Sequence, residues 1–170
     1  MDTSYGRPMA HDTSVIKLAA EQLCKRVGLN FADEQAVADM TRALGWGGCT
    51  FDLARALADR GWEVDDELLR ILGDADFEIL EARDAYVRRW VAAREVVPQR
   101  DVGDVVRFDY QRSPVDGEIR RIDRQHGTYT IFCESLGHVR EGDGTHGIVV
   151  PFEVIHSLFR PPETFCLEAA

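Results

Sequence analysis

A cysteine stands at the point where one helix is expected to begin, directly after two glycines. The segment reads Gly47-Gly48-Cys49-Thr50-Phe51, and the apolar spacing that follows it is that of a helix. Backbone N–H groups and the positive end of the helix dipole favour the thiolate at such a position, which is the nucleophilic form of cysteine. Cys49 is therefore a candidate nucleophile. It would need a general base, and the most available histidine for that role is His146.

This pattern resembles the papain-like cysteine peptidases and amidases, including the CHAP type. In that class the nucleophile begins a helix, and Gly103-Asp104-Val105-Val106 resembles the strand entry that follows. The resemblance implies a divergent cysteine amidase or peptidase that uses Cys49. The class also places a histidine after that strand, where this chain has Val115-Asp116-Gly117-Glu118. The alternative is a buried structural thiol at Cys49, and the sequence favours this alternative.

No metal or cofactor is expected. The residues Cys133, His138, His146 and His156 are spaced too widely for a compact zinc site, which takes paired close ligands. The four cysteines contain no Cys-x-x-Cys pair, so free and mostly buried thiols are expected.

Helical periodicity dominates the chain before Pro98. Five helices are expected, at residues 14–27, 33–44, 50–61, 65–73 and 74–96, with Ser14, Asp33, Thr50 and Asp65 as caps of the first four. In the third, Phe51, Leu53, Ala54 and Leu57 supply the apolar residues. In the fifth, Phe77, Leu80, Val87 and Val91 are expected to form one apolar stripe.

Trp46 lies in a glycine-rich break between the second and third expected helices. The segment Gly45-Trp46-Gly47-Gly48 lacks the Gly-Lys-Ser/Thr ending of a phosphate-binding loop, so Trp46 is expected to fill space between helices. Residues 44–46, 56–57 and 64–72 also resemble a ubiquitin-associated three-helix domain, in which a Gly-aromatic loop binds a partner protein. The resemblance implies a binding role for Trp46, although any compact three-helix bundle gives much of the pattern.

Short strand-like runs separated by turn residues follow, between Val102 and Ile155. Val106, Phe108 and Tyr110 alternate with charged residues, as in a strand with one buried face. Asp116-Gly117 and His126-Gly127 are turn signals, and the three-residue spacing of Ile119 and Ile122 predicts a bulge. The glycine-rich residues 137–147 are expected to form a mobile loop.

These runs resemble an SH3-like small barrel of the Tudor or KOW type. The resemblance rests on Gly103-Asp104-x-Val-x-Phe, Gly117-x-Ile-x-x-Ile, Tyr129-x-Ile and Val150-Pro151-x-x-x-Ile155. It implies a five-stranded antiparallel barrel that binds proteins or nucleic acids without chemistry of its own. The alternative is a barrel that only packs on the helices, because a fold does not specify a function.

Charge bears on the kind of partner. The chain of 170 residues has 30 acidic and 20 basic side chains, a formal net charge of -10. Phosphate backbones repel such a protein on average, which disfavours nucleic acid and favours a protein partner. No apolar run is long enough to span a membrane and the N-terminus lacks a signal pattern, so a cytoplasmic location is expected.

We therefore expect an α+β protein with a flexible arm at 1–13, a helical domain at 14–97, an SH3-like antiparallel β-barrel at 102–159 and a C-terminal tail at 160–170. The expected function is non-catalytic: a binding, adaptor or inhibitor protein of the accessory kind found in bacteria and phage. Its expected binding residues are Trp46, Arg120, Arg121, Arg124, His138 and Arg140. The alternative function is the cysteine amidase or peptidase with Cys49 and His146.

Overall fold

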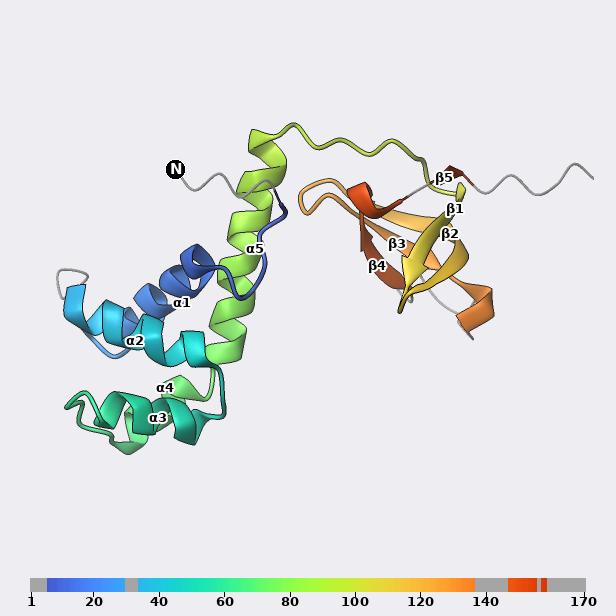
Figure 1. Cartoon of the computed structure of the whole chain (residues 1–170). Coiled ribbons are helices and arrows are strands. Elements are labelled where there is room, and N and C mark those ends of the chain that lie inside the picture. The colour runs from blue at the N-terminus through green and yellow to red at the C-terminus, as the bar shows by residue number, and fades with distance from the viewer. Residues whose placement is uncertain (1–5, 30–33, 137–146, 156, 159–170) are drawn as a thin grey trace, which may run out of the picture. The chain divides into compact units, whose positions relative to one another are not determined.

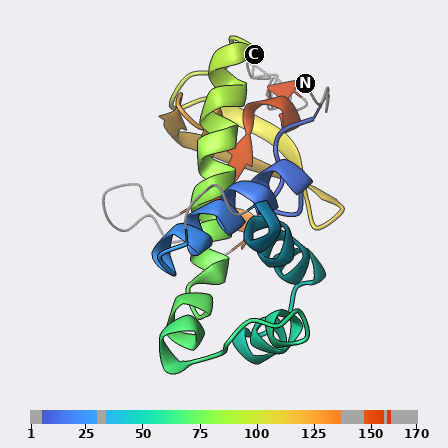
Figure 2. The ribbon, with the colours of Figure 1, turned by 90° about the vertical axis from the view of Figure 1, so that its left-hand side faces the viewer.

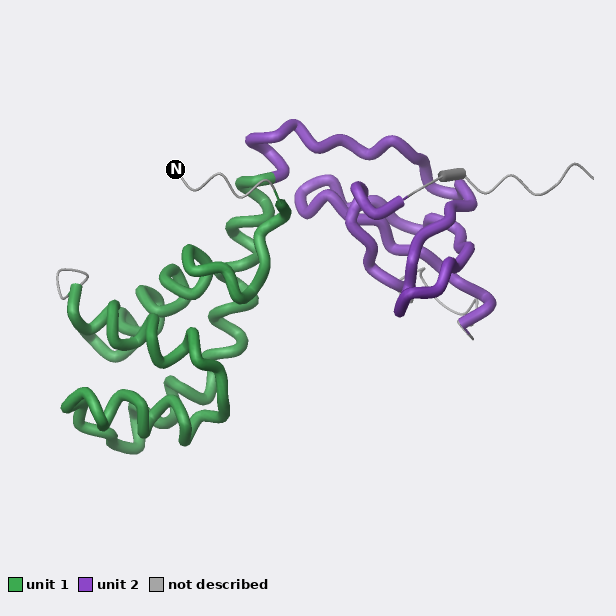
Figure 3. Tube along the Cα trace, viewed as in Figure 1, with its two compact units in different colours: residues 1–90 green, residues 91–170 purple. Residues whose placement is uncertain are grey.

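Helices occupy residues 13–93 and a curled antiparallel sheet follows them (Figure 1). The computed structural model describes residues 6–29, 34–136, 147–155 and 157–158. The predicted α+β class, helices followed by a curled antiparallel sheet, is confirmed. The chain divides into two compact units, residues 1–90 and 91–170, which are described separately below (Figure 3). The predicted tail at 160–170 lies outside the described residues, as do the capping position Asp33 and all but the last residue of the predicted loop.

The helices have the bounds α1 Thr13–Arg26, α2 Glu34–Trp46, α3 Thr50–Ala58, α4 Asp66–Leu72 and α5 Ala75–Ala93. One core joins them, with Leu23, Met40, Leu57 and Leu72 almost fully buried. α1 lies across α5 in both Figure 1 and Figure 2. Arg26 at the end of α1 bonds Asp74 and Glu78 at 2.6 and 2.8 Å, so these two helices are also joined by charge at one end.

The predicted N-cap is correct for α4, whereas the N-caps of α1 and α3 lie one or two residues before the predicted ones. The Asp65 carboxylate accepts the N–H of Leu68 at 2.8 Å, as predicted for a cap. The cap of α3 is Cys49 rather than Thr50, and that of α1 is Asp12 rather than Ser14. Both expected caps lie instead within the first turn, because the extended backbone is at Cys49, one residue before Thr50, and at Asp12, two residues before Ser14.

The predicted apolar stripe of α5 is wrong at two positions. Phe77 is 61% exposed and Leu80 is 54% exposed. The face that packs on the helical core is made by Ala75, Ile79, Ala82 and Tyr86. These residues recur every three or four positions, and two of them are alanines, which let α5 approach its neighbours closely. Phe77 and Leu80 therefore lie off the buried side of α5, whereas Val87 and Val91 are buried as predicted.

The sheet has five strands in the order β4-β3-β2-β1-β5, with all neighbours antiparallel. Their bounds are β1 Val105–Tyr110, β2 Ser113–Asp123, β3 Thr128–Phe132, β4 Ile148–Pro151 and β5 Ser157–Leu158, with 3₁₀ turns at Glu134–Leu136 and Phe152–Val154. The sheet curls into a half-barrel around a second core, in which Val106, Phe108, Ile119, Tyr129 and Ile131 are almost fully buried.

The turn between β1 and β2 is not where the sequence placed it. Asp116 and Gly117 lie inside β2, opposite Arg107 and Val106 of β1. The chain reverses at Gln111 and Arg112, whose φ values of 50° and 67° are in the left-handed region. Gly117 is needed for packing, because a Cβ there would lie 2.5 Å from Ile131 Cγ2. The predicted bulge is confirmed as a register shift between Ile119 and Arg121.

A tyrosine of β3 fixes the segment that precedes the sheet. The Tyr129 hydroxyl accepts the N–H of Gln99 at 3.0 Å and the N–H of Arg100 at 3.1 Å. Its ring packs on Phe152 with centroids 4.3 Å apart. Residues next to Pro98 are thus held by hydrogen bonds to the core of the sheet unit.

Candidate interaction surface

Trp46 is the last residue of α2, and its side chain is 87% exposed. The expectation that it fills space between helices is therefore wrong. The core face of α2 contains Met40, Ala43 and Leu44. Trp46 is two positions after Leu44, a rotation of about 200° around the helix axis at 3.6 residues per turn, so these two side chains point in nearly opposite directions.

Phe51, in the first turn of α3, is 75% exposed, although the sequence placed it with the apolar residues of that helix. The buried positions of α3 are Leu53, Ala54 and Leu57. The short connection between α2 and α3 thus has an exposed aromatic side chain at each end. We call Trp46, Phe51 and the groove that Trp46 lines the Trp46 surface.

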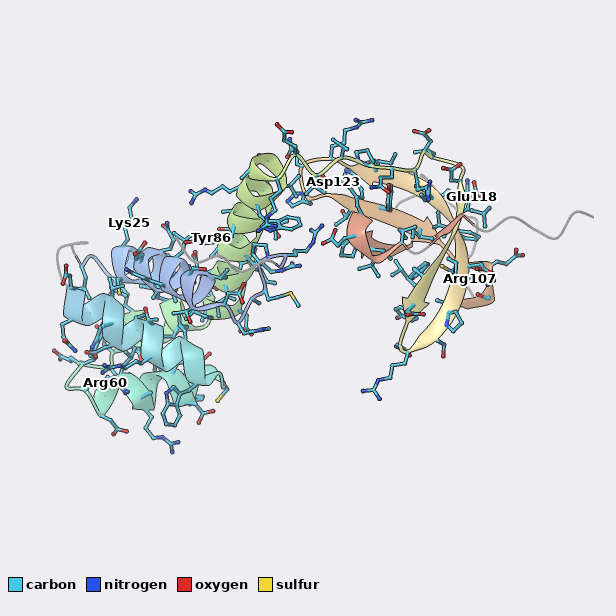
Figure 4. The ribbon with its side chains drawn as sticks, turned by 45° about the horizontal axis from the view of Figure 1, so that its top comes forward. Lys25, Arg60, Tyr86, Arg107, Glu118 and Asp123 are labelled. Atoms are coloured by element: carbon cyan, nitrogen blue, oxygen red, sulfur yellow. The ribbon has the colours of Figure 1, made fainter. Side chains whose placement is uncertain are left out.

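The groove encloses about 440 Å³ between α2 and α3. Three arginines line it: Arg42 from α2, Arg55 from α3 and Arg60 just after α3. Arg60 is labelled in Figure 4. The other lining residues are Ala43, Trp46, Gly47, Asp52, Ala56 and Asp59. The groove therefore combines one exposed indole with cations and two carboxylates, a mixture suited to a polar ligand that also offers apolar contact.

A buried carboxylate holds one wall of this groove. Asp39 of α2 is 6% exposed, and it accepts hydrogen bonds from Gln35 Nε2 at 2.9 Å and from Trp62 Nε1 at 3.4 Å. Arg60 lies 3.8 Å from the same carboxylate and also donates to the carbonyl of Ala56. Asp39 thereby ties α2 to the segment after α3, which keeps Arg60 in a fixed position at the groove.

Cys49, next to this surface, is exposed, so the expected buried structural thiol is wrong. Its thiol donates to Asp52 Oδ2 at 3.2 Å, and its backbone N–H donates to the same oxygen at 3.2 Å. These hydrogen bonds, helped by the nearby charge of Arg55 and opposed by slight burial, hold the pKa of Asp52 below its usual value. Gly48 allows the arrangement, because its φ is 122° and a Cβ there would lie 2.9 Å from Asp52 Cβ. A carboxylate thus occupies the position beside the thiol.

The predicted arginines of the sheet unit differ in their surroundings. Arg120 bonds Glu118 at 3.0 Å and lies over the ring of Phe132, 5.5 Å from its centroid. Arg121 and Arg124 are exposed, and no ion pair joins either of them to another residue in the part of the chain that is described. Of the three predicted arginines, Arg120 is therefore partly neutralised by Glu118, whereas Arg121 and Arg124 are exposed without an ion pair among the described residues.

Two further carboxylates of the sheet unit, Asp116 and Asp123, contact neighbouring side chains. Figure 4 labels Arg107, Glu118 and Asp123 on this unit. Arg107 donates to both oxygens of Asp116 at 2.7 and 2.8 Å, and these bonds lower the pKa of Asp116. Asp123 accepts the N–H groups of Gln125 and His126 at 3.0 Å each and lies 2.9 Å from the His126 ring. These carboxylates have structural roles in strand pairing and in the turn between β2 and β3.

Of the other predicted site residues, His138, Arg140 and His146 lie outside the described residues. Within the described ranges, no group of three or more His, Cys, Asp or Glu side chains is placed to hold a metal ion. None of the described helices is long and apolar enough to cross a membrane.

The sequence indicated Trp46 but missed Phe51 and the three arginines of the groove. Phe51 was assigned to the core because it lies next to Leu53 and Ala54. The arginines come from α2, α3 and the residues after α3, so only the folded arrangement shows that they share one groove. A usable signal was the number of glycines around Trp46, since three glycines within two positions leave few neighbours to bury an indole.

Comparison with protein family models, with curated proteins and with solved structures finds no match to this chain.

Proposed function

We propose that this chain is a non-catalytic interaction protein that binds a protein partner through the Trp46 surface. The observation that supports this most is the exposure of Trp46, which lines a groove with three arginines, and of Phe51 at the other end of the short connection between α2 and α3. Tryptophan and arginine are enriched among the residues that contribute most to binding energy at protein interfaces. An indole that remains in water in the free protein gains free energy when a partner covers it.

The wall of the groove is well ordered before binding. Asp39 fixes Arg60, and Gly48 with Asp52 fixes the start of α3 near Phe51. A preordered surface loses less conformational entropy when a partner binds. The surface is thus suited to recognition of a folded partner or of an extended segment that enters the groove.

Charge favours a protein over a nucleic acid. The formal net charge is -10, and the carboxylates of Asp52 and Asp59 interrupt the cations of the groove. A single strand of nucleic acid is bound by a continuous row of cations with stacking aromatic residues. A protein segment that combines apolar and both kinds of charged side chain matches this mixed lining better.

The cysteine amidase alternative has less support. Activation of a thiol requires a base that takes its proton or a cation that stabilises the thiolate. The thiol of Cys49 donates instead to the carboxylate of Asp52, and no histidine lines the groove next to it among the described residues.

Site-specific photocrosslinking tests the proposal in the cells that produce the protein. A benzophenone amino acid replaces Phe51, and a matched control carries it at Val149, which is 64% exposed on the sheet unit. We expect a crosslinked protein from position 51 that is lost when Trp46→Ala is added. A product from position 51 that survives Trp46→Ala, or no product beyond that from position 149, would contradict the proposal. A product that disappears with nuclease would show a nucleic acid instead.

A further inference from the structure

The two halves of α5 carry opposite charge. Residues 75–84 contain the four carboxylates of Asp76, Glu78, Glu81 and Asp84 with one arginine, Arg83. Residues 85–93 contain two arginines, Arg88 and Arg89, and no carboxylate, and Arg94 directly follows the helix. The helix thus has an acidic first half and a basic second half, with the change of sign near its middle.

One face of α5 is left open by the helical unit. Phe77, Leu80, Asp84, Arg88 and Ala92 recur at spacings of three or four residues, Glu81 lies four residues after Phe77 on the same face, and all six are exposed. The core face of the same helix is made by other residues, among them Tyr86. A groove of about 470 Å³ runs between this open face and α1, with Glu81, Asp84 and Arg88 among its lining residues, so α1 does not cover them.

We propose that this face of α5 binds the same face of a second copy, with the two helices antiparallel. In that arrangement the acidic half of each helix faces the basic half of the other. A two-fold axis between Asp84 and Ala85 would place Glu81 opposite Arg88 of the second copy, and Phe77 opposite Ala92 of the second copy. Each contact then occurs twice, as a two-fold interface requires.

Charge complementarity selects a second copy as the occupant. A helix with an acidic half and a basic half is complementary in charge to a second copy that runs antiparallel to it. Parallel pairing would instead place like charges opposite each other. The α5 helix has 19 residues, which gives a length of about 28 Å at 1.5 Å per residue, enough for several turns of contact. Phe77 and Leu80 would supply apolar burial at both ends of the pair, where they are otherwise in water.

Sedimentation velocity of the full chain over a wide range of concentration tests this proposal. We expect a concentration-dependent dimer that weakens with added salt. Glu81→Arg and Arg88→Glu should each weaken it roughly tenfold or more, because each change creates two like-charge contacts per dimer. The double variant should restore the dimer, since it exchanges the two signs. Phe77→Ser should weaken the dimer in either background.

The two single variants control for net charge, because they move it in opposite directions and the double variant returns it to the original value. Arg70→Glu, at an exposed position of α4 outside the Trp46 surface, is the control for charge reversal elsewhere and should leave the dimer unchanged. Circular dichroism should show the same helix content in all variants, because the changed side chains are exposed. A monomer at every concentration, or a double variant no stronger than the single ones, would overturn the proposal.

Discussion

The indole N–H of Trp62 donates to the buried carboxylate of Asp39 at 3.4 Å, and this contact joins α2 to the segment between α3 and α4. The same carboxylate lies 3.8 Å from Arg60, which lines the groove of the Trp46 surface. One wall of that groove is therefore tied to the helical core by a single buried carboxylate.

Replacement of Asp39 should destabilise the helical unit. Asp39→Ala leaves the Trp62 indole and Gln35 amide without their acceptor, which we expect to lower the free energy of unfolding by about 1–3 kcal/mol. Asp59→Ala, at an exposed carboxylate near the same groove, is the matched control and should change it little. Urea denaturation followed by tryptophan fluorescence measures both. Equal effects of the two changes would show that the Asp39 contacts do not stabilise the unit.

Two changes that involve glycine should act in opposite directions on the sheet unit. Arg112→Gly relieves a residue held at φ 67° and should stabilise the turn between β1 and β2 by up to about 1 kcal/mol. Gly117→Ala should destabilise the sheet markedly, because the new Cβ would lie 2.7 Å from the carbonyl oxygen of Phe132. Thermal unfolding of both variants checks the signs. A stable Gly117→Ala variant would mean that the register of β1 and β2 is not the one described.

Acid should weaken the sheet unit through Asp116. Hydrogen bonds from Arg107 lower the pKa of Asp116, partial burial opposes them, and the charge of Arg107 adds to the lowering. Since the folded form binds the proton less readily than the unfolded chain, this contribution is present above the ordinary aspartate pKa of about 4 and is lost as pH falls below it. Asp116→Asn should therefore be less stable at neutral pH and lose less stability on acidification.

Urea denaturation of the sheet unit across that pH range tests this difference. Asp59→Asn, on the helical unit, serves as the control and should keep the slope of the unchanged protein. An Asp116→Asn variant with the same loss of stability in acid as the unchanged chain would contradict the role given to the Arg107 pair.

The thiols should differ in their rates of alkylation. Cys49 is exposed, whereas Cys24 and Cys133 are buried. Burial, and to a lesser degree the charge of Asp116, raises the pKa of Cys133, which slows it further. We expect iodoacetamide to modify Cys49 before Cys24 and Cys133, and Cys49→Ser to remove the fast phase. A Cys49 that reacts rapidly in mildly acidic solution would instead favour the cysteine amidase.

Local signals predicted much of the fold, because they act within a few residues of the chain. The Asp65 cap, the alternation of Val106 and Phe108, and the bulge after Ile119 each depend on neighbouring residues and were correctly predicted. The faces of helices depend on what packs against them. Phe77 and Leu80 were assigned to the core because they are large and regularly spaced, but the small side chains of Ala75 and Ala82 form the contact.

The candidate site could be predicted only in part for the same reason. Trp46 stood out by its glycine neighbours, while Arg42, Arg55 and Arg60 meet only when α2 and α3 pack. Gly117 was predicted to be a turn residue because Asp-Gly is a common turn pair. Its position within β2 is explained only by the close approach of Ile131, which leaves no room for a side chain. Contacts between distant residues decided each of these cases.

Hydroxyl-radical footprinting of Trp46 tests the central claim most directly. In the purified protein an indole that is 87% exposed should be oxidised readily, while the half-buried Trp62 and Trp90 serve as internal references. Inside the cells that produce the protein, we expect the oxidation of Trp46 to fall relative to both references, because a partner covers it. Equal relative oxidation of Trp46 in the purified protein and in cells would contradict a role for the Trp46 surface in binding.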